Sequence, residues 1–242
     1  MAEELFGPYR LEGLIGRGGM GEVYRAFDTV HQRLVALKRL PAVLAADTAF
    51  RARFRAEAEH AARLHEPHII PIHDFGEIDG RLFIDMRLVE GRDLASRLAE
   101  RGPLPPARAV SVVTQVAAAL DAAHAADLAH RDIKPANILV APGQGGGEFV
   151  YVADFGLARS VRDETMSLTA TGMAVGSLAY LAPERFINGR GDHRGDVYSL
   201  GCVLFEALTA RQPFPGEGLP AMINAHLNEA PPQPSEFVPG LP

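Results

Sequence analysis

The chain has 242 residues, of which 47% are hydrophobic and 22% are charged, and its formal net charge is −6 at pH 7. This length and apolar content suffice for the core of one large domain or of two lobes. The negative net charge argues against a protein that binds nucleic acid or an acidic membrane surface. The single cysteine, Cys202, excludes an intrachain disulfide and favours a reducing compartment, so we expect a cytoplasmic location.

No stretch of this chain predicts contact with a membrane. No apolar run reaches the roughly 18–20 residues of a membrane-spanning helix. Residues 1–8 contain Glu3 and Glu4 and lack the apolar core of a signal peptide. The sequence leaves open a membrane anchor that would follow Pro242.

The cationic residues are divided unevenly between arginine and lysine. Of the 24 lysines and arginines, only Lys38 and Lys134 are lysines. In a chain that uses arginine wherever either cation serves, a lysine indicates a place that needs a compact ammonium rather than a planar guanidinium. Lys38 and Lys134 are therefore candidate functional residues.

Two strands joined by glycines are the first predicted elements. Residues 9–15 and 23–27 have strand patterns, and the turn between them has the spacing G-x-G-x-x-G-x-V. Its glycines, which let the backbone approach phosphates closely, are Gly16, Gly18 and Gly21. A dinucleotide-binding turn has similar glycines, but it needs a helix directly after them and an acidic residue about 20 positions later. Here a strand pattern and then Lys38 follow, which favours a phosphate-covering hairpin.

The next predicted element is a helix over residues 48–64. Apolar residues, among them Phe50, Phe54 and Ala61, recur at helical spacing, while arginines fall on the outer face. Glu57 lies on the apolar face, and Glu59 is the nearby alternative. The pattern favours Glu57 as the carboxylate that points inward.

Two further strands are predicted at residues 69–75 and 81–86, around the hairpin turn Asp79-Gly80. The nearby histidines are His65, His68 and His73. A proline turn separates them and no cysteine or carboxylate supports a closed site, so the pattern argues against a metal centre.

Helices dominate the following part of the chain. A short helix is predicted over residues 93–100, and Pro106 suits the first position of a long helix that ends before Asp127. His124 lies on the apolar face of this long helix. We interpret it as a satisfied core histidine rather than a catalytic one.

The most informative stretch is residues 129–156. It contains His-Arg-Asp-Ile-Lys-Pro-Ala-Asn over residues 130–137, an apolar strand, and a second strand that delivers Asp154-Phe155-Gly156. Asp132 and Asn137 flank Lys134, a cation able to meet a phosphate. Because Asp154 follows a neighbouring strand, Asp154 and Asn137 could share a hard cation such as Mg²⁺. A base, a cation and two oxygen ligands are what phosphoryl transfer requires.

A polar segment and three further elements complete the chain. Residues 157–182 end at Ala182-Pro183-Glu184 and include the hydroxyl residues Thr165, Ser167, Thr169, Thr171 and Ser177. A strongly apolar helix is predicted from Asp196 to about residue 209, followed by a helix over residues 219–228. Residues 231–242 have a proline-rich, extended pattern.

Together these motifs resemble the catalytic domain of the eukaryotic-type protein kinases. The glycine pattern, Val-Ala-Leu-Lys at Lys38, H-R-D-x-K-P-x-N, D-F-G and A-P-E occur in the family's order over about residues 9–227. Lys134 and Gly176-Ser177 favour serine/threonine over tyrosine kinases, although Ser177 stands where threonine is usual. Residues 55–58 and 169–171 favour the bacterial, Hanks-type group.

The resemblance implies an α+β, bilobal fold. It implies a small β-rich N-lobe over residues 9–86, a hinge over 87–90 and a larger helical C-lobe over 91–242. Kinase domains continue for several more helices, so we expect this C-lobe to be truncated. Glu184 would then lack the late arginine with which it pairs in the family, and the helix after Asp196 would expose an apolar patch.

The resemblance also assigns a nucleotide site between the lobes. ATP is expected there with Mg²⁺, or Mn²⁺ as an alternative, and Lys38, paired with Glu57, would bind the α/β-phosphates. Met86 takes the gatekeeper place, and adenine would meet the backbone of residues 87–89. The apolar residues among those expected at ATP are equally compatible with a plain core. The residues expected around ATP are Ile15, Gly16, Gly18, Gly19, Gly21, Val23, Ala36, Lys38, Met86, Arg87, Val89, Asp93 and Leu139.

The catalytic assignments follow from the same resemblance. Asp132 would accept or orient the proton of the substrate hydroxyl, and Lys134 would neutralise the transferred phosphoryl group. Asn137 and Asp154 would hold the metal. Asp196 would brace the backbone of the catalytic loop from below.

Regulation and partners are further expectations. Arg131, directly before the catalytic aspartate, and Arg159 would bind a phosphate on Thr171 or on Thr169 and so activate the enzyme. The expected partners are protein substrates, ATP and a second kinase copy for trans-autophosphorylation. The alternative is a non-catalytic, nucleotide-binding scaffold, but such proteins typically lose a lysine or aspartate that is present here.

Overall fold

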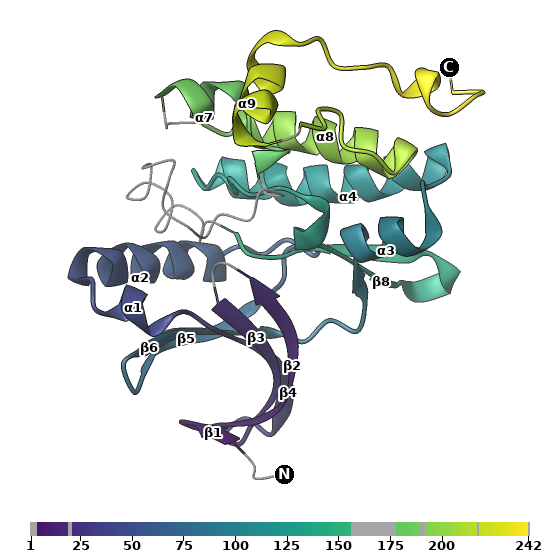
Figure 1. Ribbon diagram of the computed structural model, residues 1–242. Helices are drawn as coiled ribbons and strands as arrows, with labels where there is room; N and C mark the ends of the chain where they lie inside the picture. The colour runs from purple at the N-terminus through teal and green to yellow at the C-terminus, as the bar shows by residue number, and fades with distance from the viewer. Residues whose placement is uncertain (1–3, 19–20, 156–177, 189–191, 217, 242) are drawn as a thin grey trace.

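The computed structural model describes residues 4–18, 21–155, 178–188, 192–216 and 218–241, and it arranges them in a strand-rich and a helix-rich lobe (Figure 1). The strand-rich lobe holds one antiparallel sheet with the order β1-β2-β3-β4-β6-β5. Its strands are β1 (Glu4–Phe6), β2 (Tyr9–Gly18), β3 (Gly21–Asp28), β4 (Arg33–Arg39), β5 (Ile72–Ile78) and β6 (Arg81–Arg87). Two helices, α1 (Ala42–Ala45) and α2 (Thr48–Ala62), connect β4 to β5.

Alternation along β4 decides which way its side chains point. Val35 and Leu37 are buried in one apolar cluster with Phe6 and Phe83, whereas Ala36 belongs to a different cluster with Met86. Because successive side chains of a strand point to opposite faces, Lys38 shares the face of Ala36. The strand therefore directs its only lysine toward the other lobe.

Helix α2 packs on the sheet through its apolar face. Its buried side chains include Phe50, Phe54 and Glu57. Asp47 caps the helix, because its carboxylate accepts the N–H groups of Ala49 at 2.8 Å and of Phe50 at 3.1 Å. The cap and the buried phenylalanines fix the rotation of the helix and hold Glu57 inward.

The helix-rich lobe is built on two long helices that lie along one another (Figure 1). They are α4 (Pro106–Ala125), which has proline at its start, and α8 (Arg194–Thr209). The main core cluster joins them through residues such as Val116, Leu120 and Val203. The described part of this lobe also contains α3 (Leu94–Arg101), α7 (Pro183–Asn188) and α9 (Leu219–Asn228), with short 3-10 turns at Pro135–Asn137, Gln144–Gly146 and Pro234–Glu236.

A small second sheet lies at the junction of the lobes. It pairs β7 (Arg92–Asp93), β8 (Ile138–Pro142) and β9 (Glu148–Val152) in that order. An isolated parallel bridge joins Ile69, before β5, to Val152 at the end of β9. The loops that follow α4 and β9 are thereby held beside the strand-rich lobe.

The expected helices and strands are present, and several of their bounds differ for local reasons. The expectation of an extended end over residues 231–242 is wrong in part, because Pro234–Glu236 forms a 3-10 turn. Strand β5 begins at Ile72 rather than residue 69, because Pro71 has no N–H to donate to a ladder. Helix α3 begins at Leu94, since Asp93 is its N-cap and accepts the Ser96 N–H at 2.8 Å. Helix α8 begins two residues before Asp196, and the edge strand β1 was not expected at all.

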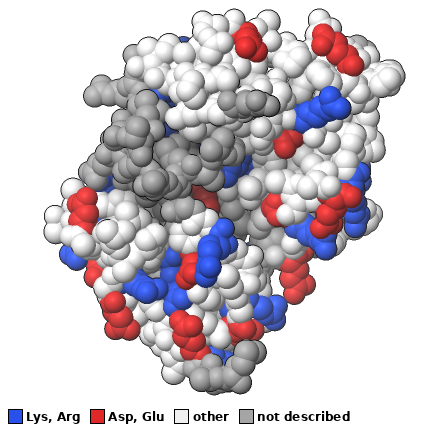
Figure 2. All heavy atoms as spheres, in the orientation of Figure 1, with Lys and Arg blue, Asp and Glu red and all other residues white. Residues whose placement is uncertain are grey.

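The apolar patch expected on the helix after Asp196 is only partly visible. Val197 is 60% exposed, whereas Leu200 and Val203 of the same helix are buried. Figure 2 shows charged side chains of both signs over the strand-rich lobe and few of them over the upper part of the helix-rich lobe. The extent of the patch stays a prediction. Among the described residues, no helix is both long and apolar enough to cross a membrane.

Candidate active site

The loop after α4 brings together the three polar side chains expected at the catalytic centre. The Asp132 Oδ2 atom accepts hydrogen bonds from Lys134 Nζ at 2.9 Å and from Asn137 Nδ2 at 3.1 Å. Asn137 Nδ2 also donates to the backbone oxygen of Asp132 at 2.8 Å. The carboxylate is thus held in place by a cation and an amide, and charge-assisted bonds of this kind are the strong ones.

Asp196 lies beneath this loop and holds its backbone. Its side chain is 1% exposed and accepts the N–H of His130 at 2.7 Å on Oδ2 and that of Arg131 at 2.7 Å on Oδ1. His124 Nε2 reaches the same Oδ2 at 2.8 Å. A buried carboxylate needs such donors, because burial without them is costly. His124 is thus a satisfied core histidine, and its partner is the aspartate under the catalytic loop.

His130 connects the loop to the strand that carries Asp154. Its ring is fully buried, and Nε2 lies 2.8 Å from the backbone oxygen of Ala153. A carbonyl oxygen can only accept, so Nε2 carries a proton, and Nδ1 accepts the N–H of Asp132 at 3.2 Å. Phe155 packs edge-on against the same ring, with centroids 4.5 Å apart.

Lys38 reaches this group of residues from the strand-rich lobe. The residue is 4% exposed, and its Nζ atom lies 2.7 Å from Asp154 Oδ1. Asp154 has a left-handed backbone with φ of 65°, which is uncommon for a residue other than glycine. Among the described residues, Lys38 forms its ion pair with Asp154 and not with Glu57.

Glu57 is nevertheless placed differently from its alternative on α2. Glu57 is 8% exposed on the inner face of the helix. Glu59 has a side chain that is 55% exposed and pairs with Arg63 one turn later. The burial pattern therefore favours Glu57 as the inward carboxylate, while its pairing with Lys38 stays a prediction.

An apolar cluster lines the space between the lobes above the hinge. Ala36 and Met86 are buried in it, with Val23, Val89 and Leu139 packed against them. A cavity of about 430 Å³, a volume in the usual range of ligand sites, opens beside this cluster. The expected ATP-site residues that line this cavity are Ile15, Val89, Asp93 and Leu139.

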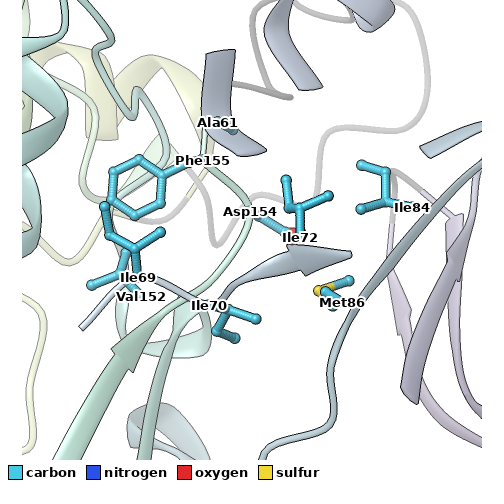
Figure 3. Close-up of a pocket in the computed structure, with 9 residues that line it drawn as sticks. All are labelled: Ala61, Ile69, Ile70, Ile72, Ile84, Met86, Val152, Asp154 and Phe155. Carbon is cyan, nitrogen blue, oxygen red and sulfur yellow. The ribbon is translucent and has the colours of Figure 1, made fainter. Parts of the chain in front are cut away.

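A smaller cavity of about 20 Å³ lies behind Met86 (Figure 3). Figure 3 shows Asp154 and Phe155 at its wall, with isoleucines from the strand-rich lobe around it. Ala61, near the C-terminal end of α2, and Asp154, which pairs with Lys38, both line this cavity.

The glycine hairpin has room only for a glycine at the position of Gly21. Gly21 has φ of 118°, and a Cβ built on it would lie 2.1 Å from the backbone oxygen of Arg39. No other residue type fits that position. A Cβ on Gly18 would have no atom of the described residues within 4 Å.

The two expected metal ligands come from adjacent backbone. Ala153, directly before Asp154, donates its N–H to the backbone oxygen of Asn137 at 2.9 Å. A carboxylate and an amide oxygen are hard ligands that suit Mg²⁺, which in such sites is held by one or two protein oxygens together with phosphates. The donor set therefore fits the expected metal.

Several expected residues cannot be placed. Gly19, Arg159, Thr169 and Thr171 lie outside the described residues, as do Thr165, Ser167 and Ser177. Glu184 is described on α7, where its Oε1 lies 3.4 Å from the Cβ position of Gly195. Among the described residues it has no ion pair with an arginine, and its lack of the family's partner stays a prediction.

The structure also reveals polar contacts that the sequence patterns did not indicate. Arg185 donates from Nη1 to the backbone oxygen of Arg131 at 2.7 Å, and Tyr180 donates its hydroxyl to Glu206. Burial, more than the nearby Glu206, raises the pKa of Tyr180, and burial also raises the pKa of Glu206. A carboxylate on the inner face of an apolar helix could have signalled Glu206, because a buried charge needs a donor.

This fold and the residues assembled between its lobes define a protein kinase domain. Residues 9–235 match the family model described as a protein kinase domain, and the chain belongs to this family. The resemblance to bacterial serine/threonine kinases is confirmed, as is the fold with a β-rich N-lobe and a helical C-lobe.

Among its relatives are serine/threonine kinases of mycobacteria. PknE of Mycobacterium tuberculosis is 54% identical over 237 residues, which are 98% of this chain and 41% of that protein. PknH of Mycobacterium bovis is 50% identical over 238 residues, 98% of this chain and 39% of the relative. The solved kinase domain of Mycobacterium tuberculosis PknI aligns with a TM-score of 0.76 at 34% identity, covering all of this chain and 86% of that one. The chain spans about two fifths of the length of these curated relatives.

Proposed function

We propose that this domain transfers the γ-phosphoryl group of ATP to serine and threonine hydroxyls of proteins. The observation that carries the proposal is the Asp132 carboxylate, which is held by Lys134 and Asn137 on a loop that buried Asp196 supports. Phosphoryl transfer needs positioned charges more than covalent chemistry, and this arrangement supplies them. ATP and a reducing environment are both found in the cytoplasm, where we place this domain.

Asp132 acts on the acceptor hydroxyl. Its carboxylate accepts or orients the hydroxyl proton, which makes the hydroxyl oxygen a better nucleophile toward phosphorus. Lys134, 2.9 Å from that carboxylate, neutralises the charge of the transferred group. Asn137 and Asp154 would hold Mg²⁺, whose positive charge would offset the negative charge of the phosphate oxygens.

Lys38 binds the phosphates from the other lobe. Its ammonium now contacts Asp154 at 2.7 Å, and a bound nucleotide would replace that contact with α- and β-phosphate oxygens. Glu57, buried on α2, would then orient the lysine. The backbone of Gly16, Gly18, Gly19 and Gly21 would cover the phosphates, and the apolar cluster around Met86 and Leu139 would enclose the adenine.

A transfer assay tests the function directly. Purified protein with γ-labelled ATP and Mg²⁺ should label a serine- or threonine-rich protein acceptor. Asp132→Asn should bind ATP–Mg²⁺ as the wild type does but transfer phosphate about 10²–10⁴-fold more slowly, the range for a positioned general base. Wild-type turnover by this variant would refute the role of Asp132. Nucleotide binding with no transfer by the wild type would instead indicate a non-catalytic scaffold.

Phosphorylation of the segment after Asp154 is the proposed switch. Arg131 directly precedes Asp132, and together with Arg159 it would bind a phosphate on Thr171, or on Thr169, through charge-assisted hydrogen bonds. A second copy of the kinase would deliver that phosphate. After incubation with ATP, mass spectrometry should find phosphate on one of these threonines.

The matching variants isolate this switch. The double variant Thr169→Ala, Thr171→Ala should lose roughly tenfold or more of its activity, in the range of removing one to three charge-assisted hydrogen bonds. Thr165→Ala with Ser167→Ala is the control in the same segment. Full activity in the first pair, or equal loss in both, would contradict the proposal.

A further inference from the structure

Arg185 contacts the peptide group from which the catalytic aspartate extends. It lies on α7, which directly follows the Ala182-Pro183 turn, and its Nη1 atom donates to the Arg131 backbone oxygen at 2.7 Å. This oxygen belongs to the peptide bond between Arg131 and Asp132. The contact joins two segments that are 54 positions apart in the sequence.

The same peptide group is also held at its other edge. The N–H of Asp132 donates to His130 Nδ1 at 3.2 Å, and the N–H of Arg131, one peptide earlier, donates to Asp196 at 2.7 Å. The side chains of His130 and Asp196 therefore accept hydrogen bonds from these two N–H groups, while Arg185 donates to the carbonyl. Because a peptide group is planar, fixing both edges fixes its orientation and that of Asp132.

The backbone at this point needs support from its surroundings. Arg131 has φ of 66°, in the left-handed region that residues with a Cβ rarely adopt. Such strained conformations persist where neighbouring groups determine them, and they gather at functional sites. A guanidinium bonded to a carbonyl is a charge-assisted contact suited to this task.

Arg185 is itself presented by a well-anchored helix. The next residue, Phe186, packs on the His226 ring of α9 with centroids 5.7 Å apart, and His226 shares a 2.7 Å hydrogen bond with the Tyr198 hydroxyl of α8. Figure 1 shows α7 beside α9, at the far side of the catalytic loop from the strand-rich lobe. Because this guanidinium is bonded to the Arg131 carbonyl, the position of α7 affects that of the catalytic loop.

We propose that Arg185 is a positioning residue for Asp132, acting through the Arg131 carbonyl. The proposal rests on the phosphoryl-transfer function given above. Arg185 sets the orientation of the Arg131–Asp132 peptide, and so the direction in which the carboxylate meets the acceptor hydroxyl. The end of the segment that precedes α7 is thereby coupled to the geometry of catalysis.

Three variants test this role. Arg185→Gln removes the charge, Arg185→Lys keeps a charge on a single donor nitrogen, and Arg194→Gln changes an exposed arginine of α8 as the control. We expect kcat of Arg185→Gln to fall about 10- to 10²-fold, as when a reacting group is displaced slightly, with KM for ATP within about twofold. Arg185→Lys should recover part of kcat, and Arg194→Gln should keep the wild-type value.

Amide hydrogen exchange gives a readout that does not depend on activity. The amides of Arg131 and Asp132 should exchange faster in Arg185→Gln than in the wild type or in Arg194→Gln. If the wild type transfers no phosphate, the proposed function fails and exchange alone decides the role of Arg185. Unchanged exchange, or a rise in KM with kcat unaltered, would overturn the proposal. If Arg185→Gln does not fold, Arg185→Lys decides by the same two measurements.

Discussion

The two sides of the candidate active site are held in different ways. On the C-lobe side, the backbone that carries Asp132 is fixed by Asp196, His130 and Arg185, all from the same lobe. On the N-lobe side, the ion pair that Lys38 forms with a described residue of the other lobe is with Asp154, at 2.7 Å. The carboxylate proposed to act on the acceptor hydroxyl is therefore preorganised within one lobe, whereas the position of the ammonium proposed to bind phosphate depends on how the lobes meet.

Burial explains how contacts within the protein hold the C-lobe side. Asp196 is 1% exposed and accepts three hydrogen bonds, all from groups of the same lobe. The Asp154 side chain is 27% exposed and meets Lys38, and phosphate oxygens could take the place of this carboxylate as the partner of the lysine. Preorganised dipoles cost no rearrangement during the reaction, while an exchangeable ion pair lets substrate binding complete the site.

The largest expected effect comes from breaking the C-lobe side. Asp196→Ala leaves two backbone N–H groups and His124 without their buried acceptor, and it should lower the free energy of unfolding by about 3–5 kcal/mol. Urea unfolding measures this loss. Asp192→Ala, an exposed carboxylate just before the same helix, is the control and should cost much less. Equal losses in the two variants would show that Asp196 does not organise this side.

Breaking the N-lobe side should affect catalysis more than stability. Lys38→Arg keeps a cation near Asp154, so the free energy of unfolding should change little. A planar guanidinium nevertheless does not replace the compact ammonium of a residue that is only 4% exposed. We expect turnover to fall about 10²-fold, as when one electrostatic contact to the transition state is lost. Steady-state kinetics with Arg81→Lys as the exposed control decide the point. Turnover near the wild-type value would mean that the geometry of this cation is unimportant.

Local sequence patterns predicted most of the elements and the inventory of the site. The glycine spacing, the alternation through Lys38 and the helical period through Glu57 all depend on residues a few positions apart. The contacts that fix the catalytic loop do not. His124 meets Asp196 across 72 positions, and Arg185 meets Arg131 across 54. Neither contact follows from the periodicity of the sequence, because the packing of α4, α7 and α8 is what brings the partners together.

The ends of other elements depended on single residues. Pro71 sets the start of β5 at Ile72. Asp93, which is expected near the nucleotide, also caps α3. The edge strand β1 has only three residues and pairs with β2 alone, too short for a period-two pattern to be recognised. Propensity and spacing identify elements well, while caps, prolines and edge pairing set their bounds.

The smallest expected effect concerns Glu206, a half-buried carboxylate of α8 that contrasts with the fully buried Asp196 of the same helix. Glu206 accepts a bond from Tyr180, and burial raises its pKa above the ordinary value of 4.5 despite that bond. A raised pKa means that the folded protein binds this proton more tightly than the unfolded chain. The stability from Glu206 is therefore fully present below about pH 4.5 and is lost as pH rises through the folded-state pKa.

Replacing Glu206 with glutamine should remove that pH dependence. The amide oxygen can still accept the Tyr180 hydroxyl, and no charge remains to be buried. At pH 7 Glu206→Gln should be more stable than the wild type by an amount on the order of 1 kcal/mol, and the difference should shrink toward pH 4.5. Urea unfolding across that range, with the exposed Glu229→Gln as control, isolates the effect because other titrating groups cancel in the comparison. A difference that stays constant with pH would mean that burial does not raise the pKa of Glu206 in the folded protein.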